Sequence, residues 1–237
     1  MTRAPFSNQK PVIKRTTSIP ITSTTTGKPP EDSSPKGAEL PHILNEMNSM
    51  CGQTAVRPLN LVVGGEATAR GDWPWLVALY VVSDNGPTFK CGSTLISRKL
   101  VVTDALQTGA EKAIPHPDFK PKSDRTDADI GLVILAQTVE FTSFIKPICL
   151  WRGNADLQNI MQKNGTVVGW GRDETGRKTT PEPRMASVPV VSRDDCMDSK
   201  EEFRHILTSK RMFCAGARGL GPCNGDSGGV LMFPLQN

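Results

Sequence analysis

The chain has 237 residues, of which 37% are hydrophobic and 22% charged, and its formal net charge is +4. This length suits one large domain or two small ones, and the apolar fraction is that of a globular protein. Residues 1–40 hold six basic and three acidic residues, so most of the positive charge belongs to the N-terminal tail. The near-neutral remainder argues against a nucleic-acid-binding domain, and no apolar run approaches the ~20 residues of a membrane-spanning helix.

Residues 1–50 are predicted to be a disordered tail rich in Ser, Thr and Pro. Residues 1–40 contain 18 of these three residue types and few aliphatic ones. Such a segment cannot bury enough apolar surface to offset its chain entropy. The first residues show no apolar stretch of the kind found in a secretory signal peptide, and the tail is a candidate for O-glycosylation if the protein is exported.

From residue 51 onward, short segments rich in β-branched residues alternate with Gly, Pro and Asp. Their spacing, and the absence of long 3.6-residue periodicity, predict an all-β barrel or sandwich. The segments expected to be strands are 76–82, 93–97, 100–103, 130–135, 166–170, 187–191 and 212–215. One helix is expected after Ser192, because Ser192 and Asp195 resemble a capping box.

Six cysteines lie far apart in the chain, at positions 51, 91, 149, 196, 214 and 223. None of them forms a C-x-x-C pair, so a zinc site is not expected, and neither another metal nor a cofactor is predicted. Widely separated cysteines fit disulfides in a secreted protein. The alternative is that all six are reduced core thiols.

The most specific motif is Gly-Asp-Ser-Gly-Gly at residues 225–229. Gly225 permits a tight turn, in which the N–H groups of Gly225 and Ser227 could face one oxyanion. Ser227 is then the candidate nucleophile, and Asp226 could hold the turn by accepting an ammonium group. The alternative, a glycine-rich loop in an unrelated protein, is disfavoured because other motifs agree.

From about residue 51 to the end, the chain resembles the chymotrypsin/trypsin-like serine peptidase family. A narrower resemblance, carried by Cys-Asn-Gly-Asp-Ser at 223–227 and Leu-Trp-Arg-Gly-Asn at 150–154, is to the gastrulation-defective-type proteases of arthropod cascades. The segments that resemble family landmarks, in order, are Val62-Val-Gly-Gly65, Trp73-Pro-Trp75, Cys91-Gly-Ser-Thr-Leu-Ile-Ser97, Asp127-Ala-Asp-Ile-Gly-Leu132, Lys146-Pro-Ile-Cys149, Val168-Gly-Trp-Gly171 and Phe213-Cys-Ala-Gly216.

The resemblance implies an all-β fold of two six-stranded antiparallel barrels, both incomplete here. Residues 1–50 would be the tail, 51–61 a remnant of the activation segment, and 62–237 the truncated peptidase domain. In this family the general base is a His in a Thr-Ala-Ala-His-Cys sequence, whereas here Thr103 is followed by Asp-Ala-Leu-Gln. Only 26 positions separate Thr103 from Asp129, too few for the family's intervening strands at roughly ten residues per strand and turn. The final strands and C-terminal helix are expected to be missing as well.

For the catalytic site, the resemblance implies that Asp129 is the Asp of a catalytic triad and Ser227 its nucleophile. The amides of Gly225 and Ser227 would form the oxyanion hole. No histidine is expected to supply the base: His116 matches a surface turn of the family, and the other two histidines match no catalytic feature. These two are His42 and His205.

For activation and specificity, the resemblance implies that Val62 becomes the new N-terminus and that its ammonium pairs with Asp226. Val62 follows Leu61, so either a protease that does not require Arg or Lys cleaves there, or no cleavage occurs. Gly221 would form the floor of the specificity pocket, which does not support a preference for Arg or Lys. Asn164 begins a glycosylation sequon, which could equally be a turn before the next strand.

For the cysteines, the resemblance implies the disulfides Cys51–Cys149 and Cys196–Cys214. Cys91 and Cys223 are expected to be free, because their family partners would lie in the two missing pieces.

The sequence therefore predicts a serine endopeptidase family member that acts by acyl transfer through Ser227. As it stands, the chain is expected to be impaired or inactive, because the general base is absent. The alternatives are a non-catalytic serine protease homologue that binds partners in an extracellular protease cascade, and a partial gene product. Partners are expected to be protein or peptide substrates or cascade proteins, with no nucleic acid and no membrane, and the location to be extracellular.

Overall fold

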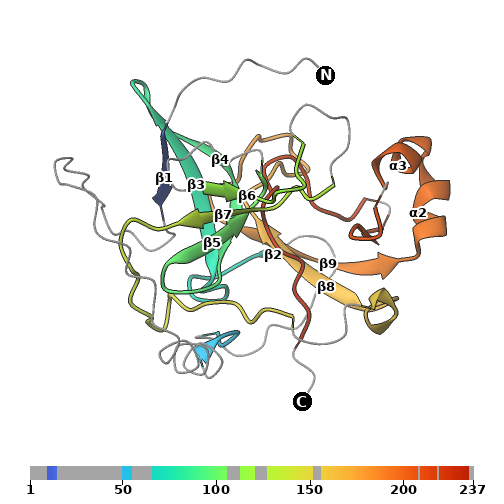
Figure 1. The fold of residues 1–237 in the computed structure, drawn as a ribbon, viewed down its shortest axis with the longest axis horizontal. Helices are drawn as coiled ribbons and strands as arrows, with labels where there is room; N and C mark the ends of the chain where they lie inside the picture. Colours follow the sequence, from blue (N-terminus) through green and yellow to red (C-terminus); the bar gives the residue numbers. More distant parts are fainter. Residues whose placement is uncertain are drawn as a thin grey trace.

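The computed structural model of the chain describes residues 10–14, 50–54, 66–105, 113–120, 127–151, 156–207, 209–217 and 219–234. These residues form two antiparallel sheets, with two short α-helices at the far end of the second sheet (Figure 1). Within these ranges, no helix is both long and apolar enough to cross a membrane. The prediction of an all-β fold is confirmed.

The first sheet has six strands in the order β1-β3-β4-β5-β7-β6, and all neighbouring strands are antiparallel. β1 and β6 are its two edges, so within the described residues the sheet stays open. The prediction of an incomplete barrel is therefore confirmed. The strands are β1 (Lys10–Lys14), β3 (Leu76–Ser83), β4 (Gly86–Leu95), β5 (Leu100–Thr103), β6 (Ala113–Pro115) and β7 (Gly131–Ile134).

β1 lies within the tail for which the sequence predicts disorder. It pairs with β3 from Lys10 opposite Val82 to Lys14 opposite Ala78. Its sequence, KPVIK, has lysines at both ends and a proline, which is typical of edge strands because such residues discourage further pairing. Residues 1–9 and 15–49 lie outside the described residues.

The first half of β3, residues 76–79, is buried on both faces, and its sequence there is continuously apolar. Val77 packs into the core of the first sheet with Val101 and Val133. Leu76 and Ala78 belong to a second cluster, together with residues of the second sheet. Because successive strand residues point to opposite faces, β3 contributes to both clusters.

β4 begins at Gly86, seven residues before the expected start at residue 93. A tight hairpin joins β3 to β4, with Ser83 paired to Gly86, which has a φ of +96°. Residues 86–90 pair with β3 although they are mostly exposed. The apolar pattern therefore missed the distal half of this hairpin.

The second sheet is built around β9 (Arg184–Val191), which pairs with β2 (Glu66–Ala67), β8 (Asn164–Gly169) and β10 (Cys214–Ala215). A 3-10 helix, η2 (Leu157–Asn159), precedes β8. After β9 follow α2 (Arg193–Ser199) and α3 (Glu201–Ile206).

The start of α2 is as the sequence predicted. Ser192 is its N-cap and accepts a hydrogen bond from the Asp195 N–H at 3.0 Å, while the Ser192 hydroxyl donates to the Asp195 carboxylate at 2.6 Å. This reciprocal pairing satisfies one of the free N–H groups of the first turn. α3 was not predicted.

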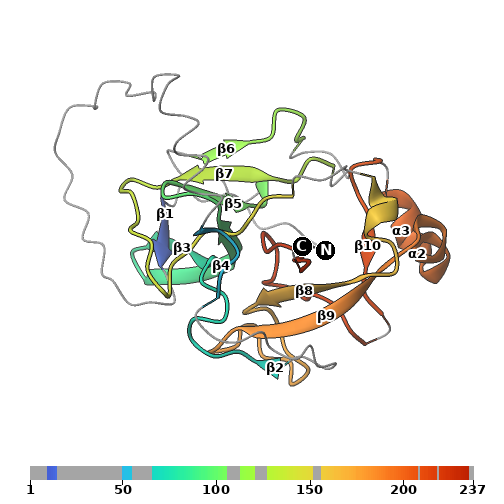
Figure 2. The same cartoon turned by 90° about the horizontal axis from the view of Figure 1, so that it is seen from below.

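Met232 joins the two sheets. It forms a β-bridge with Thr166 of β8, and it packs against both hydrophobic clusters. The indole N–H of Trp75 donates to its sulfur at 3.0 Å. In Figure 2 the C-terminal segment, drawn in red, lies between the two sheets. The Gly-Asp-Ser-Gly-Gly loop, which immediately precedes this segment, therefore sits at the junction.

Candidate active site

The loop that carries Ser227 packs against the backbone of β4 and β5. Gly228 has a φ of +77°, and a Cβ atom there would lie 2.3 Å from the Gly92 carbonyl oxygen and 2.4 Å from Thr103 Oγ1. Both the backbone conformation and the lack of space therefore require glycine. Ser227 itself is exposed, so this close approach anchors the loop and leaves the serine accessible.

The carboxylate of Asp226 is enclosed by two glycines where β8 ends. Its Oδ1 accepts a hydrogen bond from the Gly171 N–H at 2.7 Å, and its Oδ2 accepts one from the Cys223 N–H at 2.9 Å. A Cβ atom would lie 2.2 Å from Asp226 Oδ1 at Gly169 and 2.5 Å from Asp226 Oδ2 at Gly171. The Val-Gly-Trp-Gly segment at 168–171 thus makes room for this carboxylate, a role that the sequence analysis did not assign.

The turn before Ser227 leaves two backbone donors available. Gly225 has a φ of +103°. The turn is closed by hydrogen bonds from the Asp226 N–H to the Cys223 carbonyl and from the Gly229 N–H to the Asp226 carbonyl, both at 3.0 Å. In the part of the chain that the structure describes, the N–H groups of Gly225 and Ser227 have no acceptor. Free, neighbouring N–H groups are what an oxyanion hole requires.

Asp129 lies two residues before β7 and contacts the residues that follow β5. Its Oδ1 accepts a hydrogen bond from the Ala105 N–H at 2.8 Å. The same short segment contacts the Ser227 loop, because a Cβ atom on Gly228 would lie 3.1 Å from the Asp104 backbone nitrogen. Residues 103–105 therefore lie between the two candidate catalytic residues and touch the surroundings of both.

This segment leads to the position at which the resemblance described above would place a histidine base. Ala105 is followed by Leu106, and residues 106–112 lie outside the described residues. The preceding Asp104 is 8% exposed, so the segment carries a buried carboxyl group beside the Ser227 loop. The sequence analysis noted Asp104 only as a departure from the family pattern.

Neither histidine in the described ranges forms a hydrogen bond with Ser227 or Asp129. His116 lies in a turn after β6, where its Nδ1 accepts a hydrogen bond from the Asp118 N–H at 3.1 Å. His205 is exposed in the last turn of α3. Residue 42, the third histidine, lies outside the described residues.

Cys91 and Thr103 form a buried polar pair behind the Ser227 loop. The Thr103 hydroxyl donates to the Gly92 carbonyl at 3.1 Å, and its oxygen lies 3.5 Å from Cys91 Sγ. Burial raises the pKa of the Cys91 thiol to about 12. This thiol is therefore protonated at neutral pH and is a poor nucleophile.

The structure contains the disulfides Cys51–Cys149 and Cys196–Cys214, with Cα–Cα separations of 4.9 and 6.2 Å. These are the two pairs that the resemblance implies. Cys91 is free and buried, whereas Cys223 is free and exposed.

The remaining predicted site residues form no hydrogen bond with Ser227 or Asp129 within the described ranges, or lie outside these ranges. Gly221 is exposed and follows a β-bridge between Ala217 and Leu220. Asn164 is exposed at the start of β8. Val62 lies outside the described residues. Within the described ranges, no three His, Cys, Asp or Glu side chains gather in a group that could hold a metal ion.

A sequence model of one protein family, described as Trypsin, matches residues 105–236. The match begins at the residue whose N–H binds Asp129. It includes the whole Ser227 loop and both helices.

Two curated proteins illustrate the relatives of this chain. Serine protease gd of Drosophila melanogaster is 30% identical over 194 residues, which is 62% of this chain and 36% of that protein. Phenoloxidase-activating factor 1 of Holotrichia diomphalia is 29% identical over 219 residues, which is 74% of this chain and 59% of that protein. The chain thus spans between about a third and three fifths of these relatives.

Among solved structures, one described as GrC superposes with a TM-score of 0.61. The alignment covers 72% of this chain and 83% of that chain at 23% sequence identity. This similarity establishes a shared fold.

Proposed function

The chain belongs to the trypsin family of serine peptidases, and we propose that it is a member whose acyl-transfer centre lacks its general base. The observation that carries the proposal is the segment 103–105, which contacts both Asp129 and the Ser227 loop. This segment continues into Leu106 rather than into a histidine. The chain therefore retains a nucleophile and an orienting carboxylate without the group that would accept the proton.

In a complete centre, the base removes the Ser227 hydroxyl proton as Oγ bonds to the carbonyl carbon of the substrate. The amides of Gly225 and Ser227 stabilise the oxyanion that forms. The peptide C–N bond then breaks while the base passes its proton to the leaving amine, and water hydrolyses the acyl-enzyme by the same steps. Asp129 orients the base and stabilises its charged form.

Without a base, the Ser227 hydroxyl keeps its proton and attacks slowly. On the scale measured when a triad base is removed, hydrolysis falls by about 10⁶-fold. Two neighbouring carboxylates are already engaged, since Asp129 binds the Ala105 N–H and Asp226 binds two N–H groups. We further propose that a freed Val62 ammonium would add to the contacts of Asp226.

Active-site acylation tests this proposal. A chromogenic ester that acylates serine peptidases is mixed with the protein, and the burst of released chromophore is compared with the protein concentration. We expect no burst beyond that of the matched variant Ser227→Ala. A stoichiometric burst that Ser227→Ala abolishes would refute the proposal, because it would mean that a base is present.

A second candidate function is a non-catalytic homologue that binds partners of a protease cascade outside the cell. It is favoured by the same missing base and by two disulfides, which form in oxidising compartments. The test adds the folded chain to a trypsin-family protease that is cleaving its protein substrate. A concentration-dependent change in rate supports this function if Ser227→Ala gives the same change. No change in rate, together with a non-cooperative thermal melt, would instead favour a partial gene product.

A further inference from the structure

The residue before Asp129 has an unusual backbone conformation. Ala128 has a φ of +57°, a left-handed conformation that residues with a Cβ atom rarely adopt. Its carbonyl oxygen accepts a hydrogen bond from the Ile130 N–H at 2.7 Å, which closes a three-residue turn around Asp129. A strained turn of this kind persists only where surrounding contacts hold it.

The turn is held on its downstream side by the first sheet. Asp129 binds the Ala105 N–H, and the Ile130 carbonyl accepts a hydrogen bond from the His116 N–H at 2.9 Å. Both contacts lie after Ala128 in the chain. The upstream side must be fixed as well if the left-handed residue is to keep its conformation.

On the upstream side, Asp127 is bound by an arginine that follows α3. The two terminal nitrogens of Arg211 lie 2.6 Å from Asp127 Oδ2 and 2.7 Å from Asp118 Oδ2. We call these three residues the Arg211 network. Asp118 and Asp127 both belong to the connection between β6 and β7, whereas Arg211 belongs to the segment that leads into β10 of the second sheet. The network therefore spans the two sheets beside the candidate active site.

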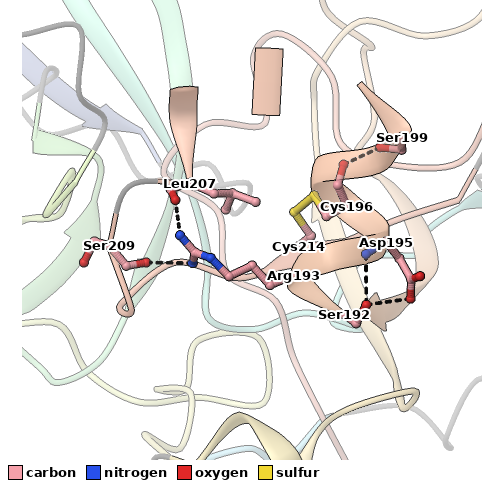
Figure 3. The surroundings of a disulfide bond; sticks show 8 residues. All are labelled: Ser192, Arg193, Asp195, Cys196, Ser199, Leu207, Ser209 and Cys214. Atoms are coloured by element: carbon pink, nitrogen blue, oxygen red, sulfur yellow. Dashed lines mark hydrogen bonds between the residues drawn. A yellow bond between two sulfur atoms is a disulfide. The ribbon is translucent and has the colours of Figure 1, made fainter. Parts of the chain in front are cut away.

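The segment that carries Arg211 is itself anchored to α2. Figure 3 shows the Arg193 side chain reaching from α2 to the carbonyl groups of Leu207 and Ser209. At its other end, the segment is tied to α2 by the disulfide between Cys196 and Cys214. Arg211 lies between these two attachments, which restrain its backbone on both sides.

The charges of the network support one another. Hydrogen bonding to Arg211 is the main cause that lowers the pKa of Asp127, and Asp127 followed by Asp118 raises the pKa of Arg211. The side chains are 49% exposed for Arg211, 59% for Asp118 and 25% for Asp127. Ion pairs this exposed contribute little to global stability, so the effect of the network is expected to be local.

We propose that Arg211 is a positioning residue for Asp129 and acts through the turn at Ala128. By fixing Asp127, it holds the left-handed turn, and the turn keeps the Asp129 carboxylate on the Ala105 N–H. The catalytic importance of this position rests on the proposed function, but the position itself can be measured without any substrate.

The test is amide hydrogen exchange measured by NMR. The exchange rate of the Ala105 N–H reports its bond to Asp129, and the Leu95 N–H, which donates to a core carbonyl at 2.8 Å, serves as the reference. In Arg211→Gln we expect Ala105 exchange to rise by about twofold to fivefold, the range for an exposed ion pair, with Leu95 unchanged. The matched control is Arg204→Gln, which removes a different surface ion pair, that with Asp198, and should change neither rate.

Two further measurements separate positioning from a general loss of stability. Salt at 1 M, where the screening length is about 3 Å, should raise Ala105 exchange in the natural protein and have no effect in Arg211→Gln. In an Ala128→Gly background, where the positive φ carries no Cβ penalty, Arg211→Gln should have a smaller effect. Equal effects in both backgrounds would overturn the proposed route through Ala128.

If Arg211→Gln does not fold, Asp118→Asn tests the same idea more gently, because it removes only one of the two carboxylates. Ala105 exchange should rise in this variant too, by less. Unchanged Ala105 exchange in whichever of these variants folds would refute the proposal. Because no substrate is present, this failure is distinct from a failure of the Ser227 chemistry, which the ester burst measures.

Discussion

Replacing Gly228 with alanine should be among the most damaging single-methyl changes in this chain. The new Cβ atom would lie 2.3 Å from the Gly92 carbonyl oxygen and 2.4 Å from Thr103 Oγ1. The Gly92 carbonyl belongs to the backbone of a paired strand, and the buried Thr103 hydroxyl donates a hydrogen bond to that same carbonyl. Neither atom can therefore withdraw without breaking contacts of the first sheet. The φ of +77° adds a conformational cost of its own.

The expected loss of stability has two parts. A left-handed residue with a Cβ atom costs about 1–2 kcal/mol, and overpacking a well-filled site costs about 1–3 kcal/mol. Gly219 provides a matched control, because it has the same φ of +77° and a Cβ atom there would have no neighbouring atom within 4 Å. Gly219→Ala should therefore lose only the first part, and Gly228→Ala about 2–5 kcal/mol in all.

Urea unfolding of the two variants and the natural protein supplies the measurement, with the free energy of unfolding taken from linear extrapolation. The difference between Gly228→Ala and Gly219→Ala isolates the contact with β4 and β5. Equal losses in the two variants would show that the Ser227 loop does not rest on these strands. The convergence of Ser227 and Asp129 on one segment would then be refuted.

Three other predictions concern the free cysteines, the missing base and the Asp127 ion pair. In the native protein, a thiol reagent at pH 8 should label the exposed Cys223 quickly and Cys91 very slowly, because burial and a pKa of about 12 keep Cys91 protonated. Peptide mapping gives the labelling rate of each cysteine, and comparable rates would contradict the prediction. Leu106→His should leave the ester burst at the level of the natural protein, because a base must be held about 3 Å from the Ser227 oxygen; a stoichiometric burst would contradict the prediction. The carboxyl group of Asp127, followed through the NMR signal of its carboxyl carbon, should titrate below the ordinary value of about 3.9, because the hydrogen bond from Arg211 lowers its pKa. The ion pair then contributes fully to stability above that ordinary value, and the contribution is lost as the pH falls through the lowered pKa. An unshifted midpoint would argue against the ion pair.

The strands that the sequence predicted best are those buried between turns. β5 has the predicted bounds of 100–103, and β3 extends only one residue beyond the predicted 76–82. Both are short apolar runs, for which the period-2 or continuous pattern is strong. β4 was predicted too short, because its first residues pair with β3 while exposed to solvent, and exposed strand residues carry no apolar signal.

The candidate site was predictable where chemistry requires a particular side chain, and not where it depends on a contact between distant segments. Ser227 and Asp129 lie in motifs that specify a serine and an aspartate at these positions. The space that Gly169 and Gly171 leave for Asp226 is visible only when β8 and the Ser227 loop are brought together. Arg211 carries no local signal, because an exposed arginine after a helix is common and its two partners are 93 and 84 residues away in sequence.

Because β3 contributes side chains to both hydrophobic clusters, the unfolding of the two sheets is coupled. Two sheets with separate cores could open one at a time, each as its own cooperative unit. Here the side chains of Leu76 and Val77 are neighbours in the chain but belong to different cores. Displacing β3 from the first sheet uncovers apolar surface in both clusters, so the two halves are expected to unfold in a single step, with hydrogen exchange in β5 and β8 rising together.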